Sequence, residues 1–219
     1  MALGRQAERA VLVHDALEGR DIADPRVLAA MNDVPRELFV PAEFTEYAYQ
    51  DRALPIGSGQ TISQPYIVAL MAQALELEPE HRVLEIGTGS GYGAAVLSRI
   101  AAEVYTVERL AELAALAHGR LVDLGYDNVV VRHADGTDGW AAHAPYDGIV
   151  VTATAQDIPA SFCEQLAIGG RLVVPVADES GGQQLLKVTR VHPDDFHRTT
   201  LGPVRFVPLR PGRAGDPSL

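Results

Sequence analysis

The sequence predicts a doubly wound α/β domain, in which helices cover both faces of a largely parallel sheet. Three observations support this prediction. Short apolar segments alternate with helical patterns through residues 82–176. These segments are apolar on both faces, as strands buried between two layers of helices must be. The first of them runs directly into a glycine-rich turn, which is typical of the first strand-to-helix connection in such folds.

Five strands are expected in this sheet, and their apolar residues define them. They are Arg82–Ile86, Val104–Val107, Val129–Val131, Gly148–Val151 and Arg171–Val174. The helix after the first strand is predicted by one inward face with the spacing i, i+3, i+4, i+7, made of Gly93, Val96, Leu97 and Ile100. A longer helix is expected from Leu110 to Leu124, ending at Gly125.

We expect a single domain over residues 1–219, divided into four parts. Residues 1–64 begin with helices, one of them capped by Asp24 before Pro25, and end in a loop rich in Gly, Thr and Ser. Residues 65–176 form the α/β core. Residues 177–209 add antiparallel strands at one edge of the sheet, and residues 210–219 form a flexible tail. The added strands are predicted at Gln184–Val191 and Val204–Leu209.

Composition limits the function classes. The net charge of −11 argues against a nucleic-acid partner, because phosphate binding needs clustered Lys and Arg. No apolar run approaches the roughly 20 residues of a membrane helix, and the N-terminus lacks a signal-peptide pattern. Cys163 is the only cysteine, so no internal disulfide can form, and we interpret it as a packing thiol. We therefore expect a cytoplasmic protein without a membrane partner, and a monomer by default.

A glycine loop follows the first strand and contains Gly87, Gly89 and Gly91. Glycines at these positions allow a tight turn, close approach of a ligand, and close packing of the next helix on the strand. The loop alone leaves several interpretations open. Residues 89–94 also fit the pattern G-x-G-x-x-A of a nicotinamide dinucleotide site. A sharp turn without any ligand is a further possibility.

Polar residues at the strand ends favour a different cofactor. Glu85 precedes the glycines, where its charge would repel a pyrophosphate but could hold the ammonium group of a ligand. Glu108 ends the second strand and could bind both ribose hydroxyls, a feature that nicotinamide enzymes share. Asp135 and Gly136 follow the third strand, where the carboxylate could accept from an adenine amino group or simply form a turn. Because carboxyl ends of parallel strands meet at one edge, these residues together predict an S-adenosylmethionine (SAM) site.

Longer motifs of the chain, from about Asp24 to Leu209, resemble those of the protein-L-isoaspartate O-methyltransferase family. The most specific is GQTISQP at residues 59–65, and the others are VPRELFVP at 34–41, VLEIGTGSGY at 83–92, VYTVER at 104–109 and VRFVPL at 204–209. Two departures are small. Ala134 stands where a glycine is common, and residues 154–156 replace the usual proline-rich turn after the fourth strand. Neither departure removes a side chain with an expected role.

The resemblance implies an enzyme that repairs damaged proteins. Such an enzyme methylates the free carboxylate of L-isoaspartyl residues, and to some extent of D-aspartyl residues, and leaves S-adenosylhomocysteine as product. The ester then closes to a succinimide, which reopens partly to normal aspartate. The resemblance also implies Ser63 as the active-site residue. With it we expect Gln60 and Thr61 to bind the substrate, and we expect no metal ion.

Elementary chemistry agrees with a site that lacks a general base. A carboxylate nucleophile has a pKa of about 4 and is already ionised at neutral pH. Catalysis then consists mostly of positioning and desolvation. The Ser63 hydroxyl could orient the acceptor carboxylate, and the glycine-rich run 57–59 could let a peptide backbone approach along an exposed edge. The residues alone, however, favour Ser63 as the N-cap of a helix with Pro65 in its first turn, and the two roles are compatible.

Three alternatives to general repair remain open at this point. A relative of this family could methylate an ordinary aspartate in a dedicated ribosomal peptide and so drive aspartimide formation. A nicotinamide-dependent oxidoreductase would use the glycine loop differently, although Glu85 argues against it. A SAM-binding module without catalysis would not need the complete run from Gln60 to Pro65.

Overall fold

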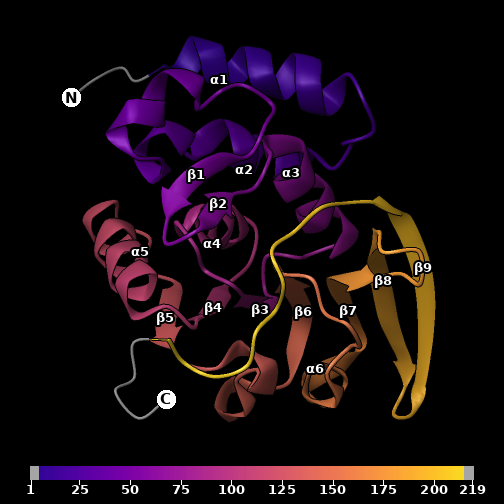
Figure 1. Cartoon of the computed structure of the whole chain (residues 1–219). Coiled ribbons are helices and arrows are strands. Elements are labelled where there is room, and N and C mark those ends of the chain that lie inside the picture. Colours follow the sequence, from indigo (N-terminus) through magenta and orange to yellow (C-terminus); the bar gives the residue numbers. More distant parts are fainter. Residues whose placement is uncertain (1–4, 215–219) are drawn as a thin grey trace.

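A computed structural model describes residues 5–214, and its centre is a seven-stranded sheet in the order β5-β4-β3-β6-β7-β8-β9 (Figure 1). The first five strands in this order are parallel, whereas β8 and β9 run antiparallel to their neighbours. The predicted doubly wound sheet is therefore confirmed. The strands are β3 (Arg82–Ile86), β4 (Glu103–Glu108), β5 (Val129–His133), β6 (Tyr146–Val151), β7 (Leu166–Ala177), β8 (Gln183–His192) and β9 (Asp195–Pro203).

Strand order reverses between β3 and β6, which fixes where a ligand can bind. The chain proceeds from β3 outward to β4 and β5, then returns to β6 on the other side of β3. The connections at the carboxyl ends of β3 and β6 therefore diverge and leave a crevice, the usual ligand site of open α/β sheets. The Thr152 amide after β6 donates to the Ile86 carbonyl of β3 at 2.9 Å and closes the floor of this crevice.

Helices cover both faces of the sheet. They are α1 (Gln6–Leu12), α2 (Pro25–Asp33), α3 (Pro65–Ala74), α4 (Tyr92–Ser98), α5 (Ala111–Asp123) and α6 (Ala160–Gln165), with short helical segments η1 (Val13–Glu18), η2 (Arg36–Phe39), η3 (Ala42–Tyr47), η4 (Gly136–Asp138) and η5 (Ala141–His143). Successive strand residues face opposite sides. Val83 accordingly packs in the apolar core with α3 and α4, while Leu84 and Ile86 pack in the core of the other face.

The N-terminal helices pack on the α3 and α4 side of the molecule, at the top of Figure 1. As predicted, Asp24 caps α2, and its carboxylate accepts from the Arg26 amide. Phe39 is fully buried and places its ring edge-on to Tyr92 at 5.6 Å between centroids. This contact joins the N-terminal segment to α4. Among the described residues, no helix is long and apolar enough to cross a membrane.

Residues 51–64 do not form the irregular loop that their composition suggested. They contain an antiparallel hairpin of β1 (Leu54–Gly57) and β2 (Gln60–Ile62). The turn between the strands uses left-handed backbone at three successive residues, Gly57, Ser58 and Gly59, with φ of 93°, 49° and 68°. The three-residue strand β2 is too short for alternation to reveal it, which is why the sequence indicated a loop.

The prediction of a strand at Val204–Leu209 was wrong. The second added strand is β9 at 195–203, whose side chains are mostly exposed and therefore show no apolar alternation. Pro208 removes a backbone donor from the later segment. Its apolar side chains, Val204, Phe206 and Leu209, are partly buried against the two cores instead.

Residues 210–214 were expected to belong to a flexible tail, and the structure contradicts this. The Gly212 amide donates to the Asp135 carboxylate at 2.5 Å, and the Ala214 amide donates to the Arg109 carbonyl at 2.9 Å. The segment thus packs beside β4 and β5, as the yellow ribbon in Figure 1 shows. Residues 215–219 of the predicted tail lie outside the described residues.

Replacing Phe39 by Ala should destabilise the fold strongly, because it removes a fully buried ring from the junction with Tyr92. We expect a loss of about 3–5 kcal/mol in the free energy of unfolding. The neighbouring Leu38 is 47% exposed, so Leu38→Ala should change it by less than about 1 kcal/mol. Urea unfolding of both variants measures the difference, and equal losses would contradict the packing role of Phe39.

Candidate active site

The glycine loop leaves β3 through a series of backbone conformations that favour glycine. Gly87, Gly89 and Gly91 have φ of 99°, 53° and 88°. A Cβ on Gly87 would lie 2.2 Å from the Thr152 hydroxyl oxygen, so the loop could not pass β6 with a larger residue. A Cβ on Gly91 would press on Ala117 and Leu121 of α5. Gly87 and Gly89 line a cavity, whereas Gly91 serves helix packing behind it.

Glu85 carries a buried carboxylate at the edge of this cavity. The residue is 1% exposed, and the Thr106 hydroxyl donates to its Oε2 at 2.6 Å. Within residues 5–214 no cationic side chain pairs with it. Burial raises the pKa of Glu85 to about 8. A carboxylate in this position is therefore suited to a positively charged ligand group, which would supply the missing countercharge.

Helix α4 makes room for this carboxylate at Gly93. A Cβ on Gly93 would lie 2.3 Å from the Glu85 Oε1 atom. The residue lines the cavity, although the sequence indicated only an inward helix position for it. A glycine at this position of α4 is therefore explained by the space that the Glu85 side chain needs.

Glu108 fixes the loop and faces the cavity at the same time. Its Oε2 accepts from the Gly89 amide at 2.9 Å, and its Oε1 accepts from the Leu110 amide at 3.0 Å. Each carboxylate oxygen can accept a second hydrogen bond, so the group could still bind two ligand hydroxyls. Glu108 is 6% exposed and, like Glu85, lines the cavity.

Asp135 and Gly136 differ in where they lie. Gly136 lines the cavity, and a Cβ there would meet Ile86 at 2.7 Å. Asp135 is not part of the lining, because its Oδ1 accepts from the amide and hydroxyl of Thr137 and its Oδ2 from the Gly212 amide. Burial opposes its ionisation, but these hydrogen bonds outweigh burial and lower the pKa of Asp135. Asp135 therefore forms the turn that its sequence allowed, through its bonds to Thr137, and it also anchors the C-terminal segment through Gly212.

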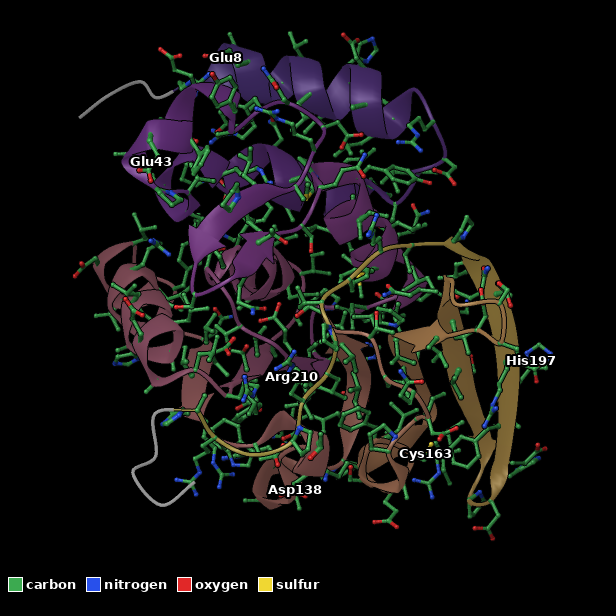
Figure 2. All side chains as sticks on the ribbon, viewed as in Figure 1. Glu8, Glu43, Asp138, Cys163, His197 and Arg210 are labelled. Atoms are coloured by element: carbon green, nitrogen blue, oxygen red, sulfur yellow. The ribbon has the colours of Figure 1, made fainter. Side chains whose placement is uncertain are left out.

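The cavity itself has a volume of about 810 Å³, within the range of sites that enclose a cofactor-sized ligand. Three parts of the chain form its walls: the strand ends and glycine loop, the hairpin with residues 58–64, and the segment 203–210. Figure 2 shows Arg210 where that last segment crosses in front of the sheet, and Cys163 lies elsewhere, on α6. Sequence patterns gave no sign that residues 203–210 form a wall.

Gln60, Thr61 and Ser63 all line this cavity, together with the strand ends. The hairpin is held there by two contacts. Ile56 lies 3.4 Å from where a Cβ on Gly89 would be, and the Ser58 hydroxyl donates to Glu112 of α5 at 3.1 Å. The glycine loop and the Gln60–Ser63 segment, predicted separately, therefore share one cavity.

Ser63 does not cap helix α3, contrary to what its spacing from Pro65 suggested. The residue before Pro65 is Gln64, and neither side chain bonds to the first helical amides. Asp51 does so instead, because its Oδ1 accepts from the Tyr66 amide at 2.9 Å. No local sequence pattern could reveal a cap that lies 15 residues away. The Ser63 hydroxyl is thereby left free of a capping role.

Other groups with possible chemistry lie outside the cavity. Cys163 is half-buried, and burial raises the pKa of its thiol. Within residues 5–214, no three His, Cys, Asp or Glu side chains are grouped as a metal site would require.

The doubly wound sheet, the glycine loop at its switch point and the acidic residues at the ends of β3 and β4 define a SAM-dependent methyltransferase. The family model "Protein-L-isoaspartate(D-aspartate) O-methyltransferase (PCMT)" matches residues 7–214. The chain belongs to the protein-L-isoaspartate(D-aspartate) O-methyltransferase family.

Individual relatives agree with this assignment. Protein-L-isoaspartate O-methyltransferase 2 of Pelobacter propionicus is 57% identical over 205 residues, which cover 94% of this chain and 91% of the relative. A solved protein-L-isoaspartate O-methyltransferase is 31% identical with a TM-score of 0.84, and the match covers 91% of this chain but only 65% of that one. A Plasmodium falciparum structure described as a beta-aspartate methyltransferase in complex with S-adenosyl-L-homocysteine is 25% identical, with a TM-score of 0.79 and coverage of 92% and 98%.

Gly93→Ala should weaken cofactor binding, because the new methyl group would displace the Glu85 carboxylate. Isothermal titration with S-adenosylhomocysteine should show a loss of at least about tenfold in affinity. Gly119 in α5 has nothing within 4 Å of its Cβ position, so Gly119→Ala is the matched control and should leave affinity unchanged. The same affinity in both variants would refute the steric argument.

Glu85 should also make the stability of the ligand-free protein pH-dependent. Its pKa is near 4.5 in an unfolded chain and about 8 when buried, so the folded state binds more protons between these values. The free energy of unfolding should then fall as pH rises from 5 to 8, by up to about 1.4 kcal/mol per pH unit. Glu85→Gln should remove this slope. Urea unfolding at both pH values tests the sign, and an equal slope in the variant would contradict it.

Proposed function

We propose that the chain transfers the methyl group of SAM to the free carboxylate of L-isoaspartyl residues, and of D-aspartyl residues, in damaged proteins, with Ser63 as the residue that orients the acceptor. The observation that carries this proposal is the shared cavity. The residues expected to hold the cofactor, apart from Gly91 and Asp135, and those expected to hold the substrate line one and the same cavity.

On the cofactor side, the residues fit SAM. The bound cofactor supplies a methyl group on a positively charged sulfur. Glu85 provides a buried negative charge for the cationic amino acid part, and Glu108 provides acceptors for the ribose hydroxyls. Gly87, Gly89 and Gly136 keep the walls free of side chains, while Gly91 holds α4 close to α5.

Asp135 was expected to meet the adenine amino group. Both of its oxygens already accept hydrogen bonds from the chain, and it does not line the cavity. We therefore assign it an indirect role, in which it holds the segment that forms the third wall. Gly136, directly after it, is the residue of this pair that would lie beside the cofactor.

On the acceptor side, the Ser63 hydroxyl donates to one oxygen of the substrate carboxylate and directs the other oxygen towards the methyl group. SAM, when bound, would supply the methyl group and leave as S-adenosylhomocysteine, so the acceptor oxygen would need no proton transfer. Thr61 and Gln60 are the further polar groups on this wall. Arg109, Arg205 and Arg210 also line the cavity, and their positive charges would favour the entry of an anionic substrate.

The substrate backbone has a place beside β2. This strand pairs with β1 on one side and with no other strand among residues 5–214 on the other. A peptide added along that edge would gain main-chain hydrogen bonds, and these depend little on sequence. Such binding suits an enzyme whose target residues occur in many sequence contexts.

Of the alternatives, the family assignment contradicts a nicotinamide-dependent oxidoreductase, and the intact Gln60–Ser63 wall opposes a module without catalysis. Methylation of a dedicated ribosomal peptide has no support in the relatives, which are named for isoaspartate. We further propose that the protein works in the cytoplasm as a monomer, without a nucleic-acid or membrane partner.

Ser63→Ala should lower the rate of methyl transfer by about 10–100-fold, because the acceptor carboxylate loses its orienting donor. The measurement is methanol release from SAM and an isoaspartyl peptide, with the aspartyl peptide of the same sequence as control. Binding of S-adenosylhomocysteine should stay unchanged. Unaltered transfer by the variant would remove Ser63 from the mechanism, and equal methylation of both peptides would overturn isoaspartyl specificity.

A further inference from the structure

We infer that Asp51 is a positioning residue for methyl transfer, because it ties the segment that carries Ser63 to the start of helix α3. The inference rests on the proposed function of Ser63. Asp51 does not line the active-site cavity, so it would act through its neighbours.

The Asp51 carboxylate bonds to both sides of the junction between β2 and α3. Its Oδ1 accepts from the Tyr66 amide at 2.9 Å, and its Oδ2 accepts from the Gln64 side chain at 2.7 Å. Ser63 directly precedes Gln64, and β2 ends at Ile62. One carboxylate therefore fixes the direction in which the chain leaves the cavity wall and enters the helix.

A third partner of the Asp51 carboxylate is charged. Arg20 Nη1 lies 3.4 Å from Asp51 Oδ2, and the Arg20 guanidinium carbon lies 3.4 Å from the centroid of the Tyr66 ring. Arg20 thus contacts both residues of this hydrogen bond, Asp51 at its other carboxylate oxygen and Tyr66 at its ring. These contacts restrain the carboxylate to one orientation, although its side chain is 21% exposed.

The backbone around Asp51 is anchored from inside the protein. Arg36 is fully buried, and its Nε donates to the Ala48 carbonyl at 2.9 Å. Its Nη2 lies 3.4 Å from the Arg52 carbonyl, so the guanidinium holds the chain on both sides of Asp51. A continuous series of contacts therefore leads from the buried core through Asp51 to the residue beside Ser63.

Asp24 offers a matched control for this role. It also caps a helix that has proline at its first position, and its side chain is 16% exposed. Its hydrogen bond to the Arg26 amide is local, and no residue of α2 lines the cavity. Loss of either cap should lower the melting temperature to a similar extent, but only loss of Asp51 should disturb the active site.

The test compares Asp51→Ala, Asp51→Asn and Asp24→Ala with the wild type at a temperature where all are folded. For an isoaspartyl peptide, D51A should lower kcat/KM by at least about tenfold through misplacement of Ser63. D24A should keep the wild-type value, and S-adenosylhomocysteine should bind all variants equally. D51N retains an acceptor for the Tyr66 amide and should recover part of the activity.

Amide hydrogen exchange gives a readout that does not depend on catalysis. Exchange in residues 60–66 should accelerate in D51A and stay unchanged in D24A. Unchanged exchange there, equal kcat/KM in D51A and D24A, or a loss of cofactor affinity that accounts for the lost activity would each overturn the role of Asp51. Failure of the wild type to methylate the isoaspartyl peptide would instead refute the proposed function, and the exchange measurement would still decide whether Asp51 anchors the segment.

Discussion

The Glu85 carboxylate is buried without a cationic partner among the described residues, and the residues around it are arranged to accommodate it. The Thr106 hydroxyl donates to it from β4, and Gly93 leaves the space that it occupies below α4. A buried carboxylate without a cation is costly, so a ligand that carries a positive charge gains binding energy there. The fold thus buries a polar position beside the cavity, and a positively charged ligand group would complete it.

The β1–β2 hairpin, which lines one wall of the cavity, depends on contacts from several parts of the chain. A hairpin of two short strands would not be stable alone. It is held through Ile56 at the glycine loop, through Ser58 at α5, and through the backbone that Arg36 fixes. Because these anchors lie in different parts of the chain, the walls of the cavity are built from segments that pack against one another.

The parallel core was predictable because its strands β3, β4 and β6 are buried on both faces and its connections contain helical periodicity. The cofactor wall was also predictable, since the glycines and acids stand at fixed places relative to strand ends. The rest escaped prediction for physical reasons. The β9 strand is exposed and shows no alternation, whereas Val204–Leu209 shows alternation because it packs as an extended segment. Asp51 caps a helix from 15 residues away, and no local pattern records such a contact.

The position of segment 203–214 in the chain determines when the cavity can be completed during synthesis. It crosses the cavity, bonds to Thr154 through Val207 and Leu209, and ends beside Leu110 and Asp135 (Figure 1). During synthesis from the N-terminus, the strands of the central sheet leave the ribosome before this segment does. A nascent chain can therefore assemble its sheet and glycine loop while the cavity still lacks a wall. Competence to enclose a ligand is therefore acquired only after the strands of the sheet have been synthesised.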